Sequence, residues 1–78
     1  MENLSISEGE EVMIIKVIEV VSESTKSWED AAQNAVTDAS ATVKNITGVD
    51  VIGFKGEVQN GKIVKYKAHC KIAFIVDK

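Results

Sequence analysis

The chain has 78 residues, a formal net charge of −3, 45% hydrophobic residues and a single cysteine. This length predicts one domain with a small core, and the acidic balance argues against a nucleic-acid-binding protein, which usually needs a net basic surface. No apolar run reaches the ~18–20 residues that cross a membrane. Since one cysteine cannot form an internal disulfide, we expect a cytoplasmic protein with a free thiol.

The first eleven residues are predicted to be an acidic N-terminal extension, followed by one domain over residues 12–78. The glutamates of the extension are Glu2, Glu8, Glu10 and Glu11. A polar tail is the simpler interpretation of this segment. A short edge strand through Leu4 and Ile6, paired with a neighbour, is the alternative.

Val12–Val21 is rich in β-branched residues and predicts the first strand. Its apolar residues run almost without interruption, which is typical of a strand buried on both faces. Because one helix can cover only one face of a sheet, we expect a second subunit to cover the other.

A helix is predicted from Trp28 to about Asn45, where apolar residues recur at the spacing of one helical stripe. Ser24 or Ser27 can cap its start, and Ser27 followed by Asp30 approximates a capping box. Most of the stripe is alanine, so the helix and the sheet can approach closely. Gly48 is well placed to help end the helix, since glycine tolerates the left-handed conformation found beyond many helix ends.

Val49–Gln59 and Lys62–Val76 predict two strands joined at Asn60-Gly61. Asn-Gly between alternating apolar runs is a strong hairpin signal, because both central turn residues need a positive φ. The second strand has one apolar face, and its other face carries Lys65, Lys67, His69 and Lys71. The order strand, helix, strand, strand then gives an α+β domain with a three-stranded antiparallel sheet.

The register of this hairpin predicts an irregularity. A strict two-residue turn would place Lys55 on the same face as Tyr66, which conflicts with the apolar pattern. A bulge near Gly53 or Gly56, or a three-residue turn, would instead align Ile52 and Phe54 with the apolar face of the strand Lys62–Val76.

The uncovered face of the sheet is the candidate binding surface. Its cations could form an ordinary solvated strand face, or an anion-facing surface that lines an oligomer cavity; the residues are Lys65, His69 and Lys71. His69 could bind a metal only with ligands from symmetry-related chains. Because so small a sheet is weak by itself, we expect homo-oligomerisation.

Two further side chains have alternative interpretations. Trp28 is either an anchor that packs on the sheet or a neighbouring subunit, or an aromatic platform for a planar ligand. Cys70 is either a small buried hydrophobe or, if its face opens to solvent, a reactive thiol. Neither a catalytic triad, a carboxylate dyad nor a nucleotide fingerprint is visible, so an enzyme is not expected.

Several segments resemble the dodecins, small flavin-storage proteins of archaea and bacteria, in order and spacing. They are Lys16–Val21, Ser24, Ser27–Ala32, Thr42–Ile46, Lys55-Gly56, Asn60–Lys62, Tyr66 and Ile72–Phe74. The resemblance covers about four fifths of the chain, from Ile15 to Asp77. It implies a sheet wrapped around one helix, and a hollow homo-oligomer of twelve copies that stores a small ligand.

The resemblance also implies where a flavin such as FMN or riboflavin would bind. Dodecins stack the flavin ring on a tryptophan just after the helix and hold its edge with a glutamine; the corresponding residues here are Gly48 and Lys67. Glycine offers no ring, and lysine offers donors but no acceptor. The chain therefore resembles a branch without that tryptophan, with weakened or absent flavin binding.

That branch is associated with calcium, but we find no oxygen-rich loop in which to place the ion. The lysines would favour other small anionic ligands, such as coenzyme A. A looser resemblance, to a small oligomeric selenium-binding protein of methanogens, gives the alternative function of a selenium or metalloid carrier. Its thiol would be Cys70.

Overall fold

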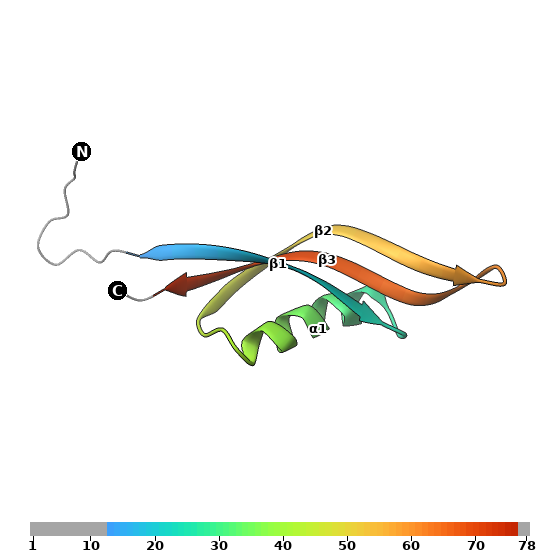
Figure 1. Ribbon diagram of the computed structural model, residues 1–78, viewed down its shortest axis with the longest axis horizontal. Helices are drawn as coiled ribbons and strands as arrows, with labels where there is room; N and C mark the ends of the chain where they lie inside the picture. The colour runs from blue at the N-terminus through green and yellow to red at the C-terminus, as the bar shows by residue number, and fades with distance from the viewer. Residues whose placement is uncertain (1–12, 77–78) are drawn as a thin grey trace, which may run out of the picture.

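The computed structural model describes residues 13–76, which form a three-stranded sheet with one helix against it (Figure 1). The elements are β1 (Ile14–Ser24), α1 (Trp28–Ser40), β2 (Ile46–Gln59) and β3 (Lys62–Val76). The predicted strand–helix–strand–strand order and the α+β fold are confirmed. The predicted acidic extension, residues 1–11, lies outside the described residues.

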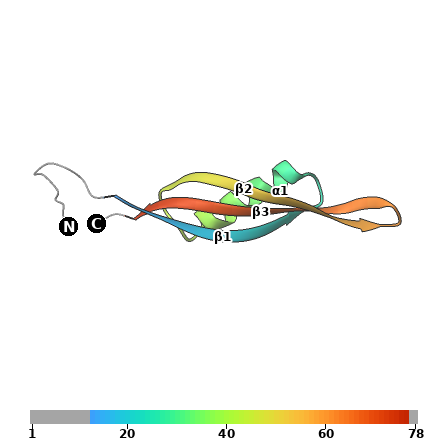
Figure 2. The same cartoon turned by 90° about the horizontal axis from the view of Figure 1, so that it is seen from above.

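β3 is the central strand, and it pairs antiparallel with β1 on one side and β2 on the other (Figure 2). Helix α1 covers one face of this sheet (Figure 1), which we call the inner face; the opposite face is the outer face. Over residues 13–76, no helix combines the length and the apolar character needed to span a membrane.

The core lies between α1 and the inner face of β3 and is built mainly from small side chains. Its buried residues are Ala31, Ala35 and Ala39 of the helix and Ala68, Cys70 and Ile72 of β3. Alanine on both sides lets the helix axis come close to the sheet. In the single chain the outer face of the first strand is open, with Val21 64% exposed, so the burial of this strand on both faces by a second subunit stays a prediction.

The start of α1 follows the predicted capping pattern. The Asp30 backbone N–H donates to Ser27 Oγ at 2.9 Å, so Ser27 is the N-cap. Ser24 has a different task, because its hydroxyl accepts from the Lys26 N–H at 2.9 Å and donates to Asp30 Oδ2 at 2.6 Å. The two serines together connect the end of β1 to the first turn of the helix.

The helix ends at Ser40, earlier than the prediction of about Asn45. Its last turn tightens, with N–H groups of residues 41 and 42 donating to carbonyls three positions back at 3.1 Å. The prediction that Gly48 helps to end the helix is wrong, since Gly48 lies within β2. Asn45 instead takes the left-handed conformation, with φ of 63°, just before β2 begins.

The β2–β3 hairpin turns at Asn60 and Gly61, whose φ angles of 53° and 77° are those of a type I′ turn. Val51 lies opposite Cys70 but Gly53 lies opposite His69, so Ile52 is the extra residue of a bulge. The predicted bulge near Gly53 is confirmed. A second irregularity lies nearer the turn, where Val58 is opposite Ile63 and Glu57 is opposite Lys65, so Val64 of β3 is an extra residue. This second shift places Phe54 on the inner face, as predicted, whereas Ile52 stays in its bulge.

The hairpin extends beyond the last residue of β1, which is Ser24 opposite Tyr66. We call the projecting ribbon, residues 56–65, the arm (Figure 1). Neither β1 nor the body of α1 accompanies the arm, so its inner face is covered only where Trp28 begins the helix.

Candidate functional site

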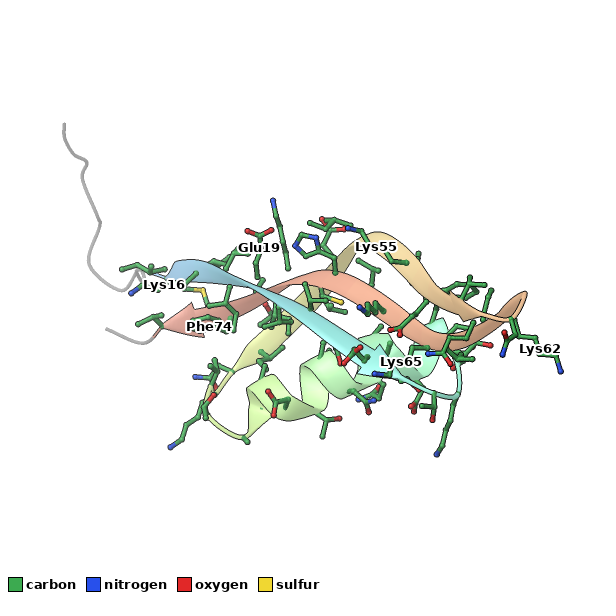
Figure 3. The ribbon with its side chains drawn as sticks, turned by 45° about the vertical axis from the view of Figure 1, so that its right-hand side comes forward. Lys16, Glu19, Lys55, Lys62, Lys65 and Phe74 are labelled. Atoms are coloured by element: carbon green, nitrogen blue, oxygen red, sulfur yellow. The ribbon has the colours of Figure 1, made fainter. Side chains whose placement is uncertain are left out.

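The outer face is the candidate ligand-binding surface, and it is built from alternate residues of all three strands. It carries Val17, Glu19, Val21 and Glu23 from β1, Lys65, Lys67, His69, Lys71 and Ala73 from β3, and Gly48, Asp50, Gly53, Lys55 and Glu57 from β2. Figure 3 shows Glu19 and Lys55 on the side of the sheet away from α1. The predicted anion-facing residues thus share one surface.

An open groove of about 300 Å³ lies at one end of the outer face. Its lining residues are Val17, Gly48, Val49, Asp50, Lys71 and Ala73. A Cβ placed on Gly48 would meet no atom within 4 Å. The groove is therefore mainly apolar and has room for a large side chain or a planar ring directly over position 48.

Gly48 and Lys67, the two residues that the resemblance assigns to a flavin site, share the outer face but lie far apart. Gly48 is opposite Ala73 in the register, and Lys67 is six residues earlier on the same strand. At ~3.4 Å per residue, this separation is about 20 Å. One chain does not bring the two positions into one pocket, so a site that uses both needs two subunits.

The cations of the outer face are accompanied by carboxylates. Glu23 Oε1 lies 3.9 Å from Lys65 Nζ and 3.8 Å from Lys67 Nζ. His69 Nε2 lies 2.9 Å from Glu19 Oε2. These groups are all partly exposed, so each pair contributes little to stability. Lys65, Lys67 and His69 of the predicted cationic row therefore each have a carboxylate neighbour.

Cys70 lies on the inner face and is 0% exposed. Its burial raises the pKa of the thiol by desolvation, so the thiol stays protonated at neutral pH. His69, its neighbour in the strand, points to the outer face and contacts Glu19 instead. This geometry is that of a small core residue, and it disfavours thiolate chemistry at Cys70.

Residues 13–76 contain no group of three or more histidine, cysteine, aspartate or glutamate side chains placed to hold a metal ion. His69 has one carboxylate neighbour, Glu19, which is not a ligand set. No residues of the described part of the chain are therefore assigned to the calcium that the resemblance suggests.

Trp28 is held firmly on the inner face. Its indole Nε1–H donates to the Lys55 carbonyl at 2.9 Å, and its ring meets Tyr66 edge-on with centroids 4.8 Å apart. Phe54 stands at 75° to the indole with centroids 6.3 Å apart, and the two rings line a shallow hollow of about 300 Å³. The anchoring interpretation of Trp28 is confirmed for the sheet.

The Trp28–Phe54 hollow was not visible in the sequence. The only available signal was the face of the strand on which Phe54 lies, which depends on the irregularity between Glu57 and Val58. Without the position of that irregularity, no pattern could place the two aromatic rings together.

The dodecin family model matches residues 14–77, which is most of the chain. The chain belongs to the dodecin family. No curated protein sequence matches it significantly.

Solved dodecin structures have the same fold. The dodecin from Streptomyces coelicolor is 27% identical, with 85% of this chain and 94% of that chain covered and a TM-score of 0.81. An arginine-to-alanine mutant of the T. thermophilus dodecin is 21% identical, with 86% and 100% covered and a TM-score of 0.82. The Streptomyces davaonensis dodecin is 24% identical, with 85% and 97% covered and a TM-score of 0.80. The last two likenesses show the fold alone.

Proposed function

We propose that this protein is a non-catalytic, homo-oligomeric small-ligand storage protein of the dodecin type, with weakened or absent flavin binding. Membership of the family supports the class of function, and dodecins as a family are flavin-binding proteins without enzymatic activity. The observation that carries the weakened binding is the open groove at Gly48, where no ring is present to stack on a flavin.

The expected loss of affinity follows from the chemistry of the two family positions. A stacked aromatic pair contributes about 0.5–1.5 kcal/mol beyond its area burial. Lys67 removes the acceptor of an amide, so one of the two hydrogen bonds to a flavin edge is lost as well. A ligand that is anionic rather than planar would lose less, because the outer face retains its lysines.

Oligomerisation is supported by the distribution of apolar surface. Residues 13–76 bury six core residues, four of them alanine, yet leave ten large hydrophobic side chains exposed. A domain of this size with so small a core is marginal alone, and exposed apolar surface of this extent is typical of an interface. Twelve subunits is the number that the family resemblance predicts.

The decisive experiment restores the missing ring. Gly48→Trp should strengthen riboflavin binding by about two- to tenfold or more, since stacking is regained in a groove with room for it. The measurement is quenching of flavin fluorescence on titration with the protein. Gly53→Trp is the matched control, because it adds the same ring to the same strand and face, away from the groove.

Equal quenching by both variants would contradict the assignment of the groove, and tight binding by the unaltered protein would contradict weakened flavin storage. Native mass spectrometry tests the assembly separately. A discrete high-order species is expected, and a monomer at all concentrations would overturn the oligomeric part of the proposal.

A further inference from the structure

The tip of the arm is formed by an asparagine followed by a glycine. Asn60 and Gly61 are the two central residues of the β2–β3 turn, with φ angles of 53° and 77°. Of the chain's four asparagines, only Asn60 precedes a glycine. Both residues are exposed, and a Cβ placed on Gly61 would meet no atom within 4 Å. Water therefore reaches this dipeptide without displacing another side chain.

The dipeptide carries an electrophile and a nucleophile. The electrophile is the amide carbon Cγ of Asn60, and the nucleophile is the backbone nitrogen of Gly61. Glycine has no Cβ, so no side chain shields this nitrogen. The backbone hydrogen bond that closes a two-residue turn is made by the flanking residues, here Gln59 and Lys62, and leaves the Gly61 N–H outside the ladder.

The closed turn holds the two groups apart. A type I′ turn keeps ψ of its first central residue at about +30°, whereas bond formation needs a rotation that brings the Gly61 nitrogen beside the Asn60 side chain. The reaction therefore starts from an opened turn. Pairing with β1 ends at Tyr66, before the arm (Figure 1). Because a two-stranded ribbon is marginally stable alone, its tip can open without unfolding of the core.

Asn45 has a similar backbone conformation but a different neighbour. Its φ is 63°, and it precedes Ile46, whose branched side chain crowds the backbone nitrogen. The Asn45 carbonyl also accepts from the Ile75 N–H at 3.0 Å, so this segment is attached to β3. Asn45 is thus a control within the same chain, a left-handed asparagine without a glycine after it.

We propose that Asn60 is a site of self-modification, at which the chain converts its own asparagine to aspartate or isoaspartate. The Gly61 nitrogen forms a bond to Asn60 Cγ, the bond from Cγ to the side-chain nitrogen breaks, and ammonia leaves with the proton of the Gly61 nitrogen. One water molecule then opens the resulting cyclic imide at either of its carbonyls. Nothing is oxidised or reduced. This inference goes beyond the proposed storage function and does not depend on it.

The two products differ in their effect on the arm. Both add a negative charge beside Lys62 at the hairpin tip (Figure 3). Aspartate keeps the length of the main chain and tolerates the left-handed conformation of the turn. Isoaspartate passes the main chain through Cγ and adds one carbon to it, which no longer fits a two-residue turn between the paired residues Gln59 and Lys62. The isoaspartate form should therefore lose pairing at the tip.

Ageing of the intact protein tests the proposal. The full-length protein is incubated at physiological temperature and weakly alkaline pH, and mass spectrometry with electron-transfer fragmentation distinguishes aspartate from isoaspartate in its peptides. Both products should accumulate at position 60 while Asn34 and Asn45 remain asparagine. In the urea-unfolded chain the rate at Asn60 should be about 5- to 30-fold higher, since opening of a marginal tip then no longer limits the reaction.

Asn60→Gly is the matched variant. A Gly-Gly pair also supports a type I′ turn but has no side-chain amide, so the variant should fold normally and form neither product at this position. Circular dichroism checks the fold. In the isoaspartate form of the unaltered protein, hydrogen exchange of residues 57–64 should be faster than before ageing, and exchange in α1 should be unchanged.

Conversion of Asn60 in the unfolded chain but not in the folded protein would overturn the proposal, because the turn would then stay closed. Equal conversion at Asn45 would show that the glycine does not direct the reaction, and would overturn the assignment to Asn60. Unchanged hydrogen exchange in the isoaspartate form would contradict the loss of pairing at the tip. Each readout is independent of flavin binding and of subunit number, so failure of the proposed function would leave these results unaffected.

Discussion

The two faces of β3 differ completely although their residues alternate along one strand. Ala68, Cys70 and Ile72 face α1 and are fully buried, whereas the residues between them, such as His69 and Lys71, face outward and carry charge. The inner face therefore determines whether this chain folds. In the single chain the outer face contributes no buried core, so it remains available for ligands and other subunits.

The largest expected effect on stability comes from a comparison of one side chain from each face. Ile72→Ala removes a fully buried side chain and should lower the free energy of unfolding by about 2–5 kcal/mol. Val21→Ala, on the outer face, should change it by no more than ~0.5 kcal/mol. Urea unfolding measures both at a protein concentration where the chain is monomeric.

An equal loss in both variants would show that the outer face is as buried as the inner one under those conditions. In that case the difference in burial between the two faces would hold only for a chain without partners. Subunit contacts that cover the outer face would then have to persist in the sample.

A smaller effect is expected where α1 is attached to the inner face. Ser27→Ala removes the N-cap that accepts from the Asp30 N–H, and should destabilise the protein by about 1 kcal/mol. Ser40→Ala is the matched control at the other helix end, where the hydroxyl donates to the Val36 carbonyl in the same helix. Thermal unfolding followed by circular dichroism should show a clear loss for Ser27→Ala and almost none for Ser40→Ala.

The smallest expected effect is a pH dependence of the stability, caused by Cys70 on the inner face. Burial raises the pKa of Cys70 in the folded state above its unfolded value, so the unfolded chain releases this proton first as the pH rises. Stability should therefore fall as the pH rises above the ordinary thiol range, from about 8.5 upward. The free energy of unfolding of the unaltered protein, minus that of Cys70→Ala, isolates this contribution, and a difference that does not change with pH would contradict it.

The alternation of β3, the hairpin turn and the Ser27 cap could be predicted because each depends on neighbouring residues alone. The helix end could not be predicted in the same way. Val43 and Ile46 continue the apolar stripe of α1, so periodicity gives no stop signal, and the chain instead turns at Asn45 and enters β2 at Ile46.

The outer groove was partly predictable and the Trp28–Phe54 hollow was not. Family resemblance pointed to Gly48 as a position of interest, but only the register shows that it lies about 20 Å from Lys67. The hollow joins Trp28 to a residue of β2 far along the chain, and that contact depends on where the β2–β3 pairing is irregular.

The bulge at Ile52 also determines where this chain can change in length. Val51 and Gly53 lie opposite Cys70 and His69, which are consecutive in β3, so Ile52 itself has no partner. Deletion of Ile52 should therefore leave a regular pairing with the other side chains on their present faces. Deletion of one residue within β1, whose pairing with β3 is regular throughout, would instead exchange the faces of every residue on one side of the deletion. The bulge is thus a position at which a strand can lose a residue without exchanging its faces.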